Sequence, residues 1–320
     1  MTNKEKYRQL CTYESSIPLF SRAWWLDATA GDEKWDVALV EKGDKIVAAM
    51  PYAIHISKKH KQIVQPSLTQ TLGPWLRHSD SKYEKKLAQQ KDFFDSLIDQ
   101  LPVYNFFIQN WNYQQTNWLP FYWRGFNQMT LYTYILYDLK DEKNIWNGLR
   151  ENIRTDIRKA NTRHGLKVRT DLDVNSFLEL NFMTFSRQDK VVPYTREYVK
   201  QLDKACADHN SRKIFIAEDN DGRHHAGVYI VWDKNSAHYL MGGSNPELRN
   251  SGATSLCLWE AIRYASTVTK QFDFEGSMIE SVERFFRAFG AVQTPYFRIT
   301  KTPSRALRAK QCLRSLLKGQ

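Results

Sequence analysis

The chain has 320 residues but only four cysteines, and their positions are scattered: Cys11, Cys206, Cys257 and Cys312. None of them has the paired spacing of a zinc site or of a small disulfide framework. No apolar run approaches the roughly 18 residues of a membrane span, and the N-terminus lacks the charged, apolar and small-residue order of a secretory signal. We therefore expect a cytoplasmic protein with no metal cofactor and no membrane-spanning helix.

Several catalytic motifs are also missing. The sequence has no Walker loop, no HExxH, no GxSxG and no dinucleotide fingerprint after a strand. His224 and His225 adjoin a predicted turn at Gly222, but adjacent strand residues point to opposite faces and make a poor metal pair, so we interpret them as a surface turn. Cys257 lies near a predicted helix start that could lower its pKa, although a small buried hydrophobe is the simpler interpretation.

The length and composition of the chain indicate a globular protein of two domains. The length exceeds the roughly 250–300 residues of a single core, and 42% hydrophobic residues with 13% aromatics are ample for two. Of the net charge of +11, six positive charges fall in residues 301–320, which contain no acid. There, leucines could share one side of a basic helix that docks on its own domain or makes peripheral contact with an anionic membrane surface.

The first half reads as a helix, a strand meander, a second helix and further strands. Aromatic and apolar periodicity, with a turn at Gly43, predicts a helix over 17–28, strands over 35–40, 45–56 and 63–72, a helix over 81–101, and strands over 103–109 and 130–139.

The second half repeats this order. The patterns predict helices over 141–164, 174–185 and 194–208, strands over 213–218, 227–232 and 237–241, a helix capped by Asn250 or Ser251, a strand over 271–275, a helix over 282–291 and a last strand. The free N–H groups at the start of the capped helix would make an anion site.

The order of elements, which occurs in both halves of the chain, resembles that of a known family. The helix ENIRTDIRKANTRHG at 151–165, the turn and helix at 245–265, the strand FDFEGS at 272–277 and the helix VERFFRAFGA at 282–291 resemble the GNAT-type acyltransferase superfamily. With Trp24-Trp25-Leu26-Asp27 they resemble its FemAB and BioF2-like branch, in which two such domains are fused.

The resemblance implies an α+β fold of tandem GNAT-like domains, each a mixed, mostly antiparallel sheet flanked by helices. We expect an N-terminal domain over 1–129, a C-terminal domain with the donor site over 130–300, and a basic C-terminal helix over 301–320. An acyl donor would enter where the fourth and fifth strands of the second domain separate.

Two donors remain open. Relatives that use acetyl-CoA have a glycine-rich pyrophosphate loop, whereas the matching segment here, residues 249–254, has one glycine. FemAB relatives take an amino acid from aminoacyl-tRNA and attach it to cell-wall precursors, and BioF2-like relatives are regarded as acetyltransferases of polysaccharide pathways. The donor-binding candidates, for acetyl-CoA or another acyl-CoA, are Tyr239, Met241, Gly242, Arg249, Ser251, Gly252, Ala253 and Thr254.

The chemistry of acyl transfer to an amine requires a base and donors to the developing oxyanion. Glu275, two positions past Asp273 on the same predicted strand face, is the candidate base, and its alternative is pairing with Arg284 or Arg287. His238 and Tyr296 are further catalytic candidates, with packing as the alternative for each. Backbone N–H groups of residues 239–243 are the candidate oxyanion donors.

A stripe of arginines, Arg150, Arg154 and Arg158, is either a solvated face or a phosphate-contacting surface for tRNA. We therefore predict an N-acyltransferase that moves an acyl group, by direct aminolysis, to an amine of a small-molecule, polysaccharide-related or cell-envelope acceptor. The alternatives are tRNA-dependent aminoacyl transfer to a peptidoglycan precursor, and a non-catalytic module that binds RNA or an anionic surface.

Overall fold

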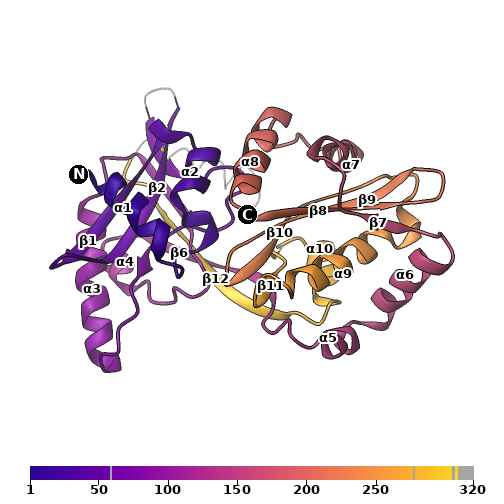
Figure 1. The fold of residues 1–320 in the computed structure, drawn as a ribbon. Coiled ribbons are helices and arrows are strands. Elements are labelled where there is room, and N and C mark those ends of the chain that lie inside the picture. The colour runs from indigo at the N-terminus through magenta and orange to yellow at the C-terminus, as the bar shows by residue number, and fades with distance from the viewer. Residues whose placement is uncertain (58–59, 277, 305–306, 309–320) are drawn as a thin grey trace. The chain divides into compact units, whose positions relative to one another are not determined.

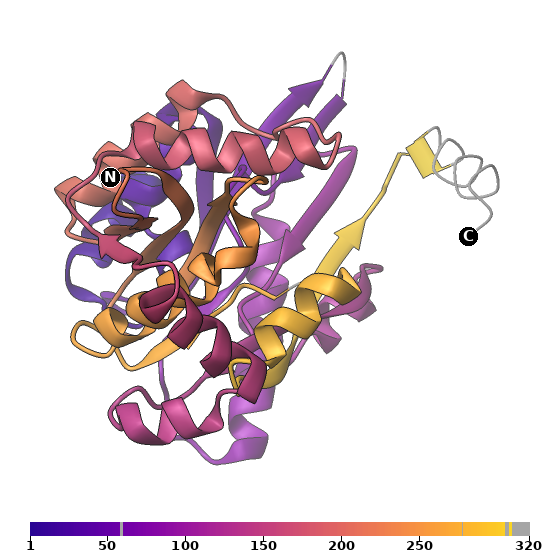
Figure 2. The ribbon, with the colours of Figure 1, turned by 90° about the vertical axis from the view of Figure 1, so that its right-hand side faces the viewer.

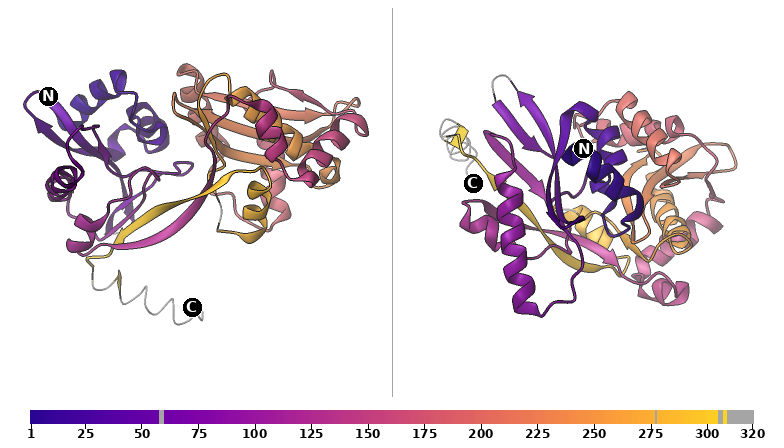
Figure 3. Two further views of the ribbon diagram at one scale, coloured as in Figure 1. Left: turned by 90° about the horizontal axis from the view of Figure 1, so that it is seen from below. Right: turned by 60° about the vertical axis from the view of Figure 1, so that its left-hand side comes forward.

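The computed structural model describes residues 1–57, 60–276, 278–304 and 307–308. They form two compact units: unit 1 contains residues 1–131 and the described chain from Pro295 on, and unit 2 contains residues 132–294. The chain passes between the units twice, within β6 (Asn127–Leu136) and within β12 (Val292–Lys301) (Figure 1, Figure 3). The sequence patterns did not anticipate this return to unit 1, where Arg298 of β12 lies opposite Asn110.

Unit 1 has a sheet in the order β1-β2-β3-β5-β12, with β4 beside β2. The predicted hairpin turn at Gly43 is confirmed, and β3 and β5 run parallel, with Gln62 opposite Phe106. The elements are α1 (Asn3–Tyr13), η1 (Leu19–Ser21), α2 (Ala23–Thr29), η2 (Asp32–Lys34), β1 (Trp35–Lys42), β2 (Lys45–Ser57), β3 (His60–Val64), β4 (Trp75–Leu76), α3 (Tyr83–Asp99), β5 (Phe106–Asn110) and α4 (Leu119–Trp123).

The sheet of unit 1 has an apolar cluster on each face, because successive strand residues point to opposite sides. Val37 and Leu39 of β1 pack in one cluster with Tyr7 of α1. Ala38, between them, packs in the other cluster with Phe94 of α3. Helices α1 and α2 therefore cover one face, and α3 and α4 cover the other.

Unit 2 has strands in the order β6-β11-β10-β9-β8-β7, and within it only the β10–β11 pair is parallel among the described pairings. Its remaining elements are α5 (Glu142–Gly148), α6 (Glu151–Thr162), β7 (Lys167–Arg169), α7 (Val174–Arg187), α8 (Arg196–Asp208), β8 (Arg212–Glu218), β9 (His224–Trp232), β10 (Ser236–Ser244), η3 (Arg249–Ser251), α9 (Ala253–Ala265), β11 (Gln271–Asp273) and α10 (Glu280–Arg287).

Helices cover both faces of this second sheet. Helices α7 and α8 lie on one face, and α6 and α9 lie on the other (Figure 1, Figure 2). The seven inner residues of β9 are accordingly all buried, and the strand reads as a continuous apolar run rather than an alternation. Gly243 of β10 allows α7 to approach closely, since a Cβ atom there would lie 2.4 Å from the backbone nitrogen of Asn181.

Several sequence expectations need correction. The strand predicted over 63–72 ends at Val64. The helix predicted over 141–164 is two helices, α5 and α6, because Leu149 adopts an extended conformation and the N–H of Arg150 bonds the carbonyl of Ala288 at 2.8 Å. The strand predicted over 271–275 ends at Asp273. The first helix, α1, was not anticipated, although Thr2 and Glu5 form a capping box there.

The basic helix predicted over 301–320 lies mostly outside the described residues. In the described part of the chain, no helix is long and apolar enough to cross a membrane. The same residues contain no cluster of three or more His, Cys, Asp or Glu side chains placed to hold a metal ion.

The close approach of α7 to β10 yields a stability prediction. Gly243→Ala should lower the free energy of unfolding by about 1–3 kcal/mol, because the added methyl group would meet backbone atoms that cannot move aside. Gly148→Ala is the matched control, since a Cβ atom there meets nothing within 4 Å. Urea denaturation monitored by circular dichroism measures both, and equal midpoints for the two variants would contradict the predicted close packing.

Candidate active site

The candidate site begins where β10 and β11 separate. Their parallel ladder runs from Ser236 opposite Gln271 to His238 opposite Asp273, and β10 then continues to Ser244 paired with β9 but no longer with β11. The register of β10 against β9 also shifts between Tyr239 and Met241, which marks a β-bulge. Bulges re-aim side chains and are frequent beside active sites. This opening lies where the resemblance predicts separated strands, and it contains the backbone of residues 239–243.

A buried carboxylate lies at the point of separation. Asp273 is 4% exposed, and its Oδ1 accepts hydrogen bonds from the Thr133 hydroxyl and from the backbone N–H of Glu275, the latter at 2.8 Å. Burial raises the pKa of Asp273 to about 6, against the opposing effect of these hydrogen bonds. Asp273 thus fixes the chain that follows β11.

His238 lies beside Asp273, with 3.8 Å between its Nδ1 and Asp273 Oδ2. Burial lowers the pKa of His238 to about 3, so the imidazole is neutral at pH 7. A neutral imidazole in this position can exchange hydrogen bonds with groups in the opening, but it carries no charge to attract an anion.

Glu275 lies beyond the strand rather than on it. Its φ of +57° is in the left-handed region, which is uncommon for a residue with a side chain. The expectation that it shares a strand face with Asp273 is therefore wrong. The next residue, Gly276, also has a positive φ, and a Cβ atom there would lie 2.1 Å from the Tyr132 carbonyl oxygen. Backbone strain of this kind is concentrated at functional sites.

Burial raises the pKa of the half-buried Glu275 carboxyl well above its ordinary value, and the neighbouring charge of Asp273 raises it further. A carboxyl with a raised pKa is better matched to proton transfer near neutral pH. The arginines named as alternative partners bond elsewhere: Arg284 pairs with Glu280 at 3.2 Å and Arg287 with Glu283 at 3.0 Å. The catalytic role of Glu275 stays a prediction.

A second group of residues forms the wall of the opening on β10. A Cβ atom on Gly242 would lie 1.8 Å from the Tyr239 hydroxyl, so that position requires glycine. Asn181 of α7 donates from Nδ2 to the Gly242 carbonyl at 2.8 Å and accepts a hydrogen bond from the Tyr194 hydroxyl at 3.1 Å. The aromatic ring of Tyr239 packs edge-on against Phe286, with 5.5 Å between the ring centroids. Asn181 was missed, although a polar residue on an apolar helix face was a visible signal.

A pocket of about 610 Å³ opens at the start of α9. Gly252, with φ of +80°, precedes the helix and allows the chain to touch α6, because a Cβ atom would lie 2.2 Å from the Asp156 carbonyl oxygen. The first N–H groups of an α-helix have no acceptor within the helix, and α9 has no side-chain cap. The pocket is lined by Asp156, Lys159, Arg249, Asn250, Gly252, Thr254, Ser255 and Phe285.

The charges of this pocket favour an anion. Lys159 and Arg249 line it together with the positive end of the α9 dipole, and Lys159 also bonds the carbonyl of Asn250. Burial raises the pKa of Asp156, whereas the charge of Lys159 opposes this shift. Lys159 and Asp156 were missed, since nothing in the sequence separates them from the other polar residues of the same helix.

Three of the eight donor-binding candidates line this pocket: Arg249, Gly252 and Thr254. The remaining candidates on this turn, Ser251 and Ala253, are buried beneath it, and Met241 is buried on β10. The structure therefore distributes the predicted set between the strand opening and the α9 pocket. Phe285 lines the pocket, and its neighbour Phe286 contacts Tyr239.

A buried relay braces the turn before α9. The His225 imidazole lies 2.9 Å from the Ser251 hydroxyl through Nδ1 and 3.0 Å from Asp219 Oδ2 through Nε2. The hydrogen bond with His225, aided by Arg223, holds the pKa of Asp219 below its ordinary range. The interpretation of this segment as a surface turn is wrong for His225, which is buried because β9 places it beneath residues 249–252.

Removing this relay should loosen the turn. His225→Ala should lower the free energy of unfolding by about 1–3 kcal/mol, because the buried oxygens of Ser251 and Asp219 each lose a hydrogen-bond partner. His224→Ala, next to it in the chain and more exposed, should change stability by less than about 0.5 kcal/mol. Guanidinium denaturation of both variants tests this, and a negligible effect of His225→Ala would refute a bracing role.

The other predicted residues do not line the α9 pocket. Tyr296 belongs to unit 1, where Gln70 donates to its hydroxyl at 3.5 Å, and its catalytic role stays a prediction. Arg154 and Arg158 both pair with Glu151, at 2.6 and 3.1 Å, so part of the charge of the arginine stripe is neutralised. Burial raises the pKa of Cys257 to about 12, which fits a core thiol.

Comparison with known proteins places this geometry in a family. Residues 147–292 match the family model of the acetyltransferase (GNAT) domain. No sequence in the set of curated proteins matched the chain.

Solved structures match nearly the whole chain. The crystal structure of FemX has a TM-score of 0.69 and 12% identity, and the match covers 93% of this chain and 96% of FemX. L-PGS from Bacillus licheniformis has a TM-score of 0.56 and 12% identity, covering 100% of this chain and 98% of that one. A tandem GNAT protein from the clavulanic acid biosynthesis pathway has a TM-score of 0.50 and 10% identity, covering 84% of both chains.

At these identities the structural matches establish the fold alone. The chain has an α+β fold with mixed sheets flanked by helices, as in FemX and tandem GNAT proteins. Residues 147–292, which hold the strand opening, the relay and the α9 pocket, form an acetyltransferase domain of the GNAT family.

Proposed function

We propose that unit 2 transfers an acyl group from an acyl-CoA to an amine, with acetyl-CoA as the simplest such donor. The observation that carries the proposal is the separation of β10 and β11 directly beside the buried carboxyl of Asp273 and the half-buried carboxyl of Glu275. The match of residues 147–292 to an acetyltransferase domain model supports the choice of donor.

The α9 pocket fits the diphosphate of such a donor. It offers the N–H groups of the first helical turn, the cations Lys159 and Arg249, and the close backbone approach allowed at Gly252. The single glycine of this turn suffices for that approach, because the residue before the helix is the one with a positive φ. When bound, the donor supplies a thioester carbonyl as the electrophile.

The residues of the opening provide the remaining chemistry. Ionised Glu275 accepts the proton that the amine loses as its nitrogen bonds to the acyl carbon, and the electron pair of the broken C–S bond leaves with sulfur. Backbone N–H groups of residues 239–243 donate to the carbonyl oxygen as it gains negative charge. Asp273 holds the Glu275 backbone in position, and His238 stays neutral beside it.

We further propose that the acceptor is an amine of a small-molecule, polysaccharide-related or cell-envelope precursor in the cytoplasm. Aminoacyl-tRNA is the alternative donor, held by Arg150, Arg154 and Arg158. We favour acyl-CoA because Glu151 pairs with two of these three arginines, whereas the α9 pocket has cations together with free helical N–H groups.

Donor binding tests the assignment of the pocket. Acetyl-CoA at about 100 times its dissociation constant should raise the stability of the protein by about 2.7 kcal/mol. Lys159→Met should weaken binding by about threefold to tenfold, because one cation at the α9 pocket is lost. Thermal-shift and calorimetric titrations measure both effects.

The matched control is Arg158→Met, one residue away on α6 and outside the pocket lining. It should leave acetyl-CoA binding unchanged. A flat thermal response to acetyl-CoA and to several longer acyl-CoAs would count against the donor. Binding of aminoacyl-tRNA that weakens in Arg154→Ala would favour the alternative instead.

Turnover tests the base. Glu275→Gln should lower the rate of CoA release in the presence of an acceptor amine by at least about 100-fold, while acetyl-CoA binding stays within about threefold of the wild type. With an amine that is neutral throughout the range, the wild-type rate should rise as pH increases, because raised carboxyl pKa values keep the base protonated at low pH.

Glu280→Gln is the control for this substitution, since Glu280 is exposed and pairs with Arg284. Its rate and its pH profile should match those of the wild type. A Glu275→Gln enzyme with unchanged turnover would remove Glu275 from the mechanism.

A further inference from the structure

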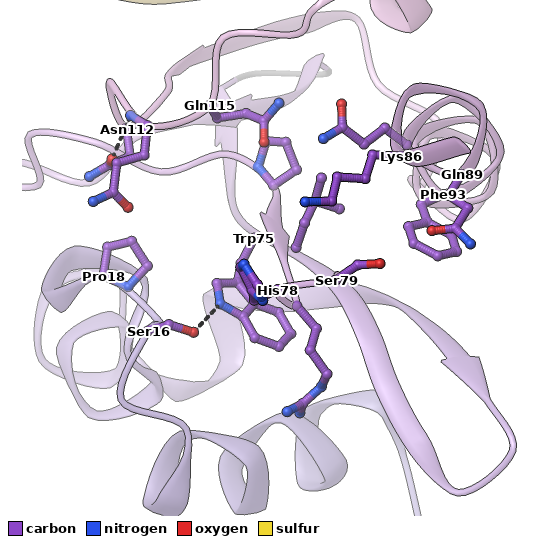
Figure 4. Close-up of a pocket in the computed structure, with 15 residues that line it drawn as sticks. Ser16, Pro18, Trp75, His78, Ser79, Lys86, Gln89, Phe93, Asn112 and Gln115 are labelled. Atoms are coloured by element: carbon purple, nitrogen blue, oxygen red, sulfur yellow. Dashed lines mark hydrogen bonds between the residues drawn. The ribbon is translucent and has the colours of Figure 1, made fainter. Parts of the chain in front are cut away.

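Unit 1 contains a cavity that the proposed acyl transfer does not use. It has a volume of about 290 Å³ and is formed by four segments of the chain (Figure 4). These are the loop before η1, the segment that follows Gly73, the first turns of α3, and the loop after β5. The lining residues that the argument uses are Trp75, His78, Lys86, Gln90, Phe93 and Gln115.

The position of this cavity repeats that of the α9 pocket in unit 2. Helix α3 connects the parallel strands β3 and β5, as α9 connects the parallel strands β10 and β11. In both units the first turns of the connecting helix line a pocket. Ligands in sheets with parallel strands bind outside the carboxyl ends of those strands, and the loop after β5 begins at such an end.

The lining of the cavity is rich in carboxamides. Side-chain amides carry both donors and acceptors, so they suit hydroxyl groups, which are also both. Two of them are held in place by Asn117, which donates to Gln90 Oε1 at 2.8 Å and accepts at its carbonyl from Gln115 Nε2 at 3.1 Å. The carboxamides of the lining are Gln89, Gln90, Asn112, Gln114 and Gln115.

An aromatic wall completes the cavity. Trp75 is fixed by the hydrogen bond from its Nε1 to Ser16 Oγ at 2.9 Å and by Arg77 over its ring. Phe93 lies on the α3 side of the same cavity (Figure 4). Polar groups that are held in position beside rigid rings form the usual composition of a small-molecule site.

The charge of the lining is positive, because none of the described residues that line the cavity is acidic. Arg77 forms an ion pair with Glu14, with 2.8 Å between the guanidinium nitrogen and the carboxylate oxygen. Lys86 extends from α3 toward the cavity (Figure 4), and no ion pair joins it to any residue in the described part of the chain. His78 is exposed beside it. An anionic group on the ligand would therefore meet Lys86.

We propose that this cavity binds a phosphorylated monosaccharide, with its hydroxyl groups on the carboxamides and its phosphate on Lys86. The volume of about 290 Å³ lies just below the roughly 300–1,000 Å³ of drug-sized ligand pockets, which suits one sugar ring rather than a nucleotide sugar. The site belongs to unit 1 alone and does not depend on the acyl transfer proposed for unit 2.

The test uses the full-length protein labelled with nitrogen-15 and three probes: glucose 1-phosphate, glucose and inorganic phosphate. Glucose 1-phosphate should bind more tightly than either of the other two and should shift the side-chain amide signals of Gln90 and Gln115. Lys86→Met should weaken the binding of glucose 1-phosphate by about tenfold, because a charged hydrogen bond is lost. The affinity for glucose should not change. Gln115→Ala should weaken both sugars.

Two controls locate the site. Lys85→Met, next to Lys86 and outside the lining, should leave all affinities unchanged. Lys159→Met, in the α9 pocket, should leave the response of the Gln90 and Gln115 amide signals to glucose 1-phosphate unchanged, even if phosphate also binds at α9. The proposal is overturned if no probe shifts the amide signals, if inorganic phosphate binds as tightly as glucose 1-phosphate, or if Lys86→Met and Lys85→Met behave alike.

Discussion

The buried carboxylate of Asp273 is the interaction on which the candidate active site depends. It stands at the last pair of the parallel ladder between β10 and β11, and it fixes the backbone of Glu275 just beyond the strand. This hydrogen bond helps to hold Glu275 in its left-handed backbone conformation, which is otherwise unfavourable for a residue with a side chain. The cost of burying the carboxyl is visible in its raised pKa, and the apolar core around Phe272 and Phe274 supplies the stability that offsets it.

The same supersecondary unit occurs twice in the chain. In each unit, a helix connects two parallel strands and its first turns line a pocket. The two pockets differ in chemistry: that of unit 2 combines cations with an uncapped helix start, and that of unit 1 combines carboxamides with aromatic rings. The strands and helices thus set where ligands can bind, and the side chains of the loops set which ligands fit.

Much of the fold was predictable because its signals are local. The turn at Gly43, the helices α7, α8 and α9, and the hairpin of β8 and β9 followed from apolar periodicity and turn residues. The break between α5 and α6 did not, because it depends on a hydrogen bond from Arg150 to Ala288, far away in the sequence. The return of β12 to unit 1 likewise depends on pairing with β5.

The sequence by itself determined most of the order of elements and the resemblance to the GNAT superfamily, which the match of residues 147–292 to a family model supports. It also predicted the segments that would hold a base and an anion site. Only the tertiary structure decided how these residues meet. It moved Glu275 off the strand, added Asp156 and Lys159 from α6 to the α9 pocket, and buried His225 between Asp219 and Ser251. Local patterns report which face of an element is apolar, whereas hydrogen bonds between distant segments arise only when those faces have packed together.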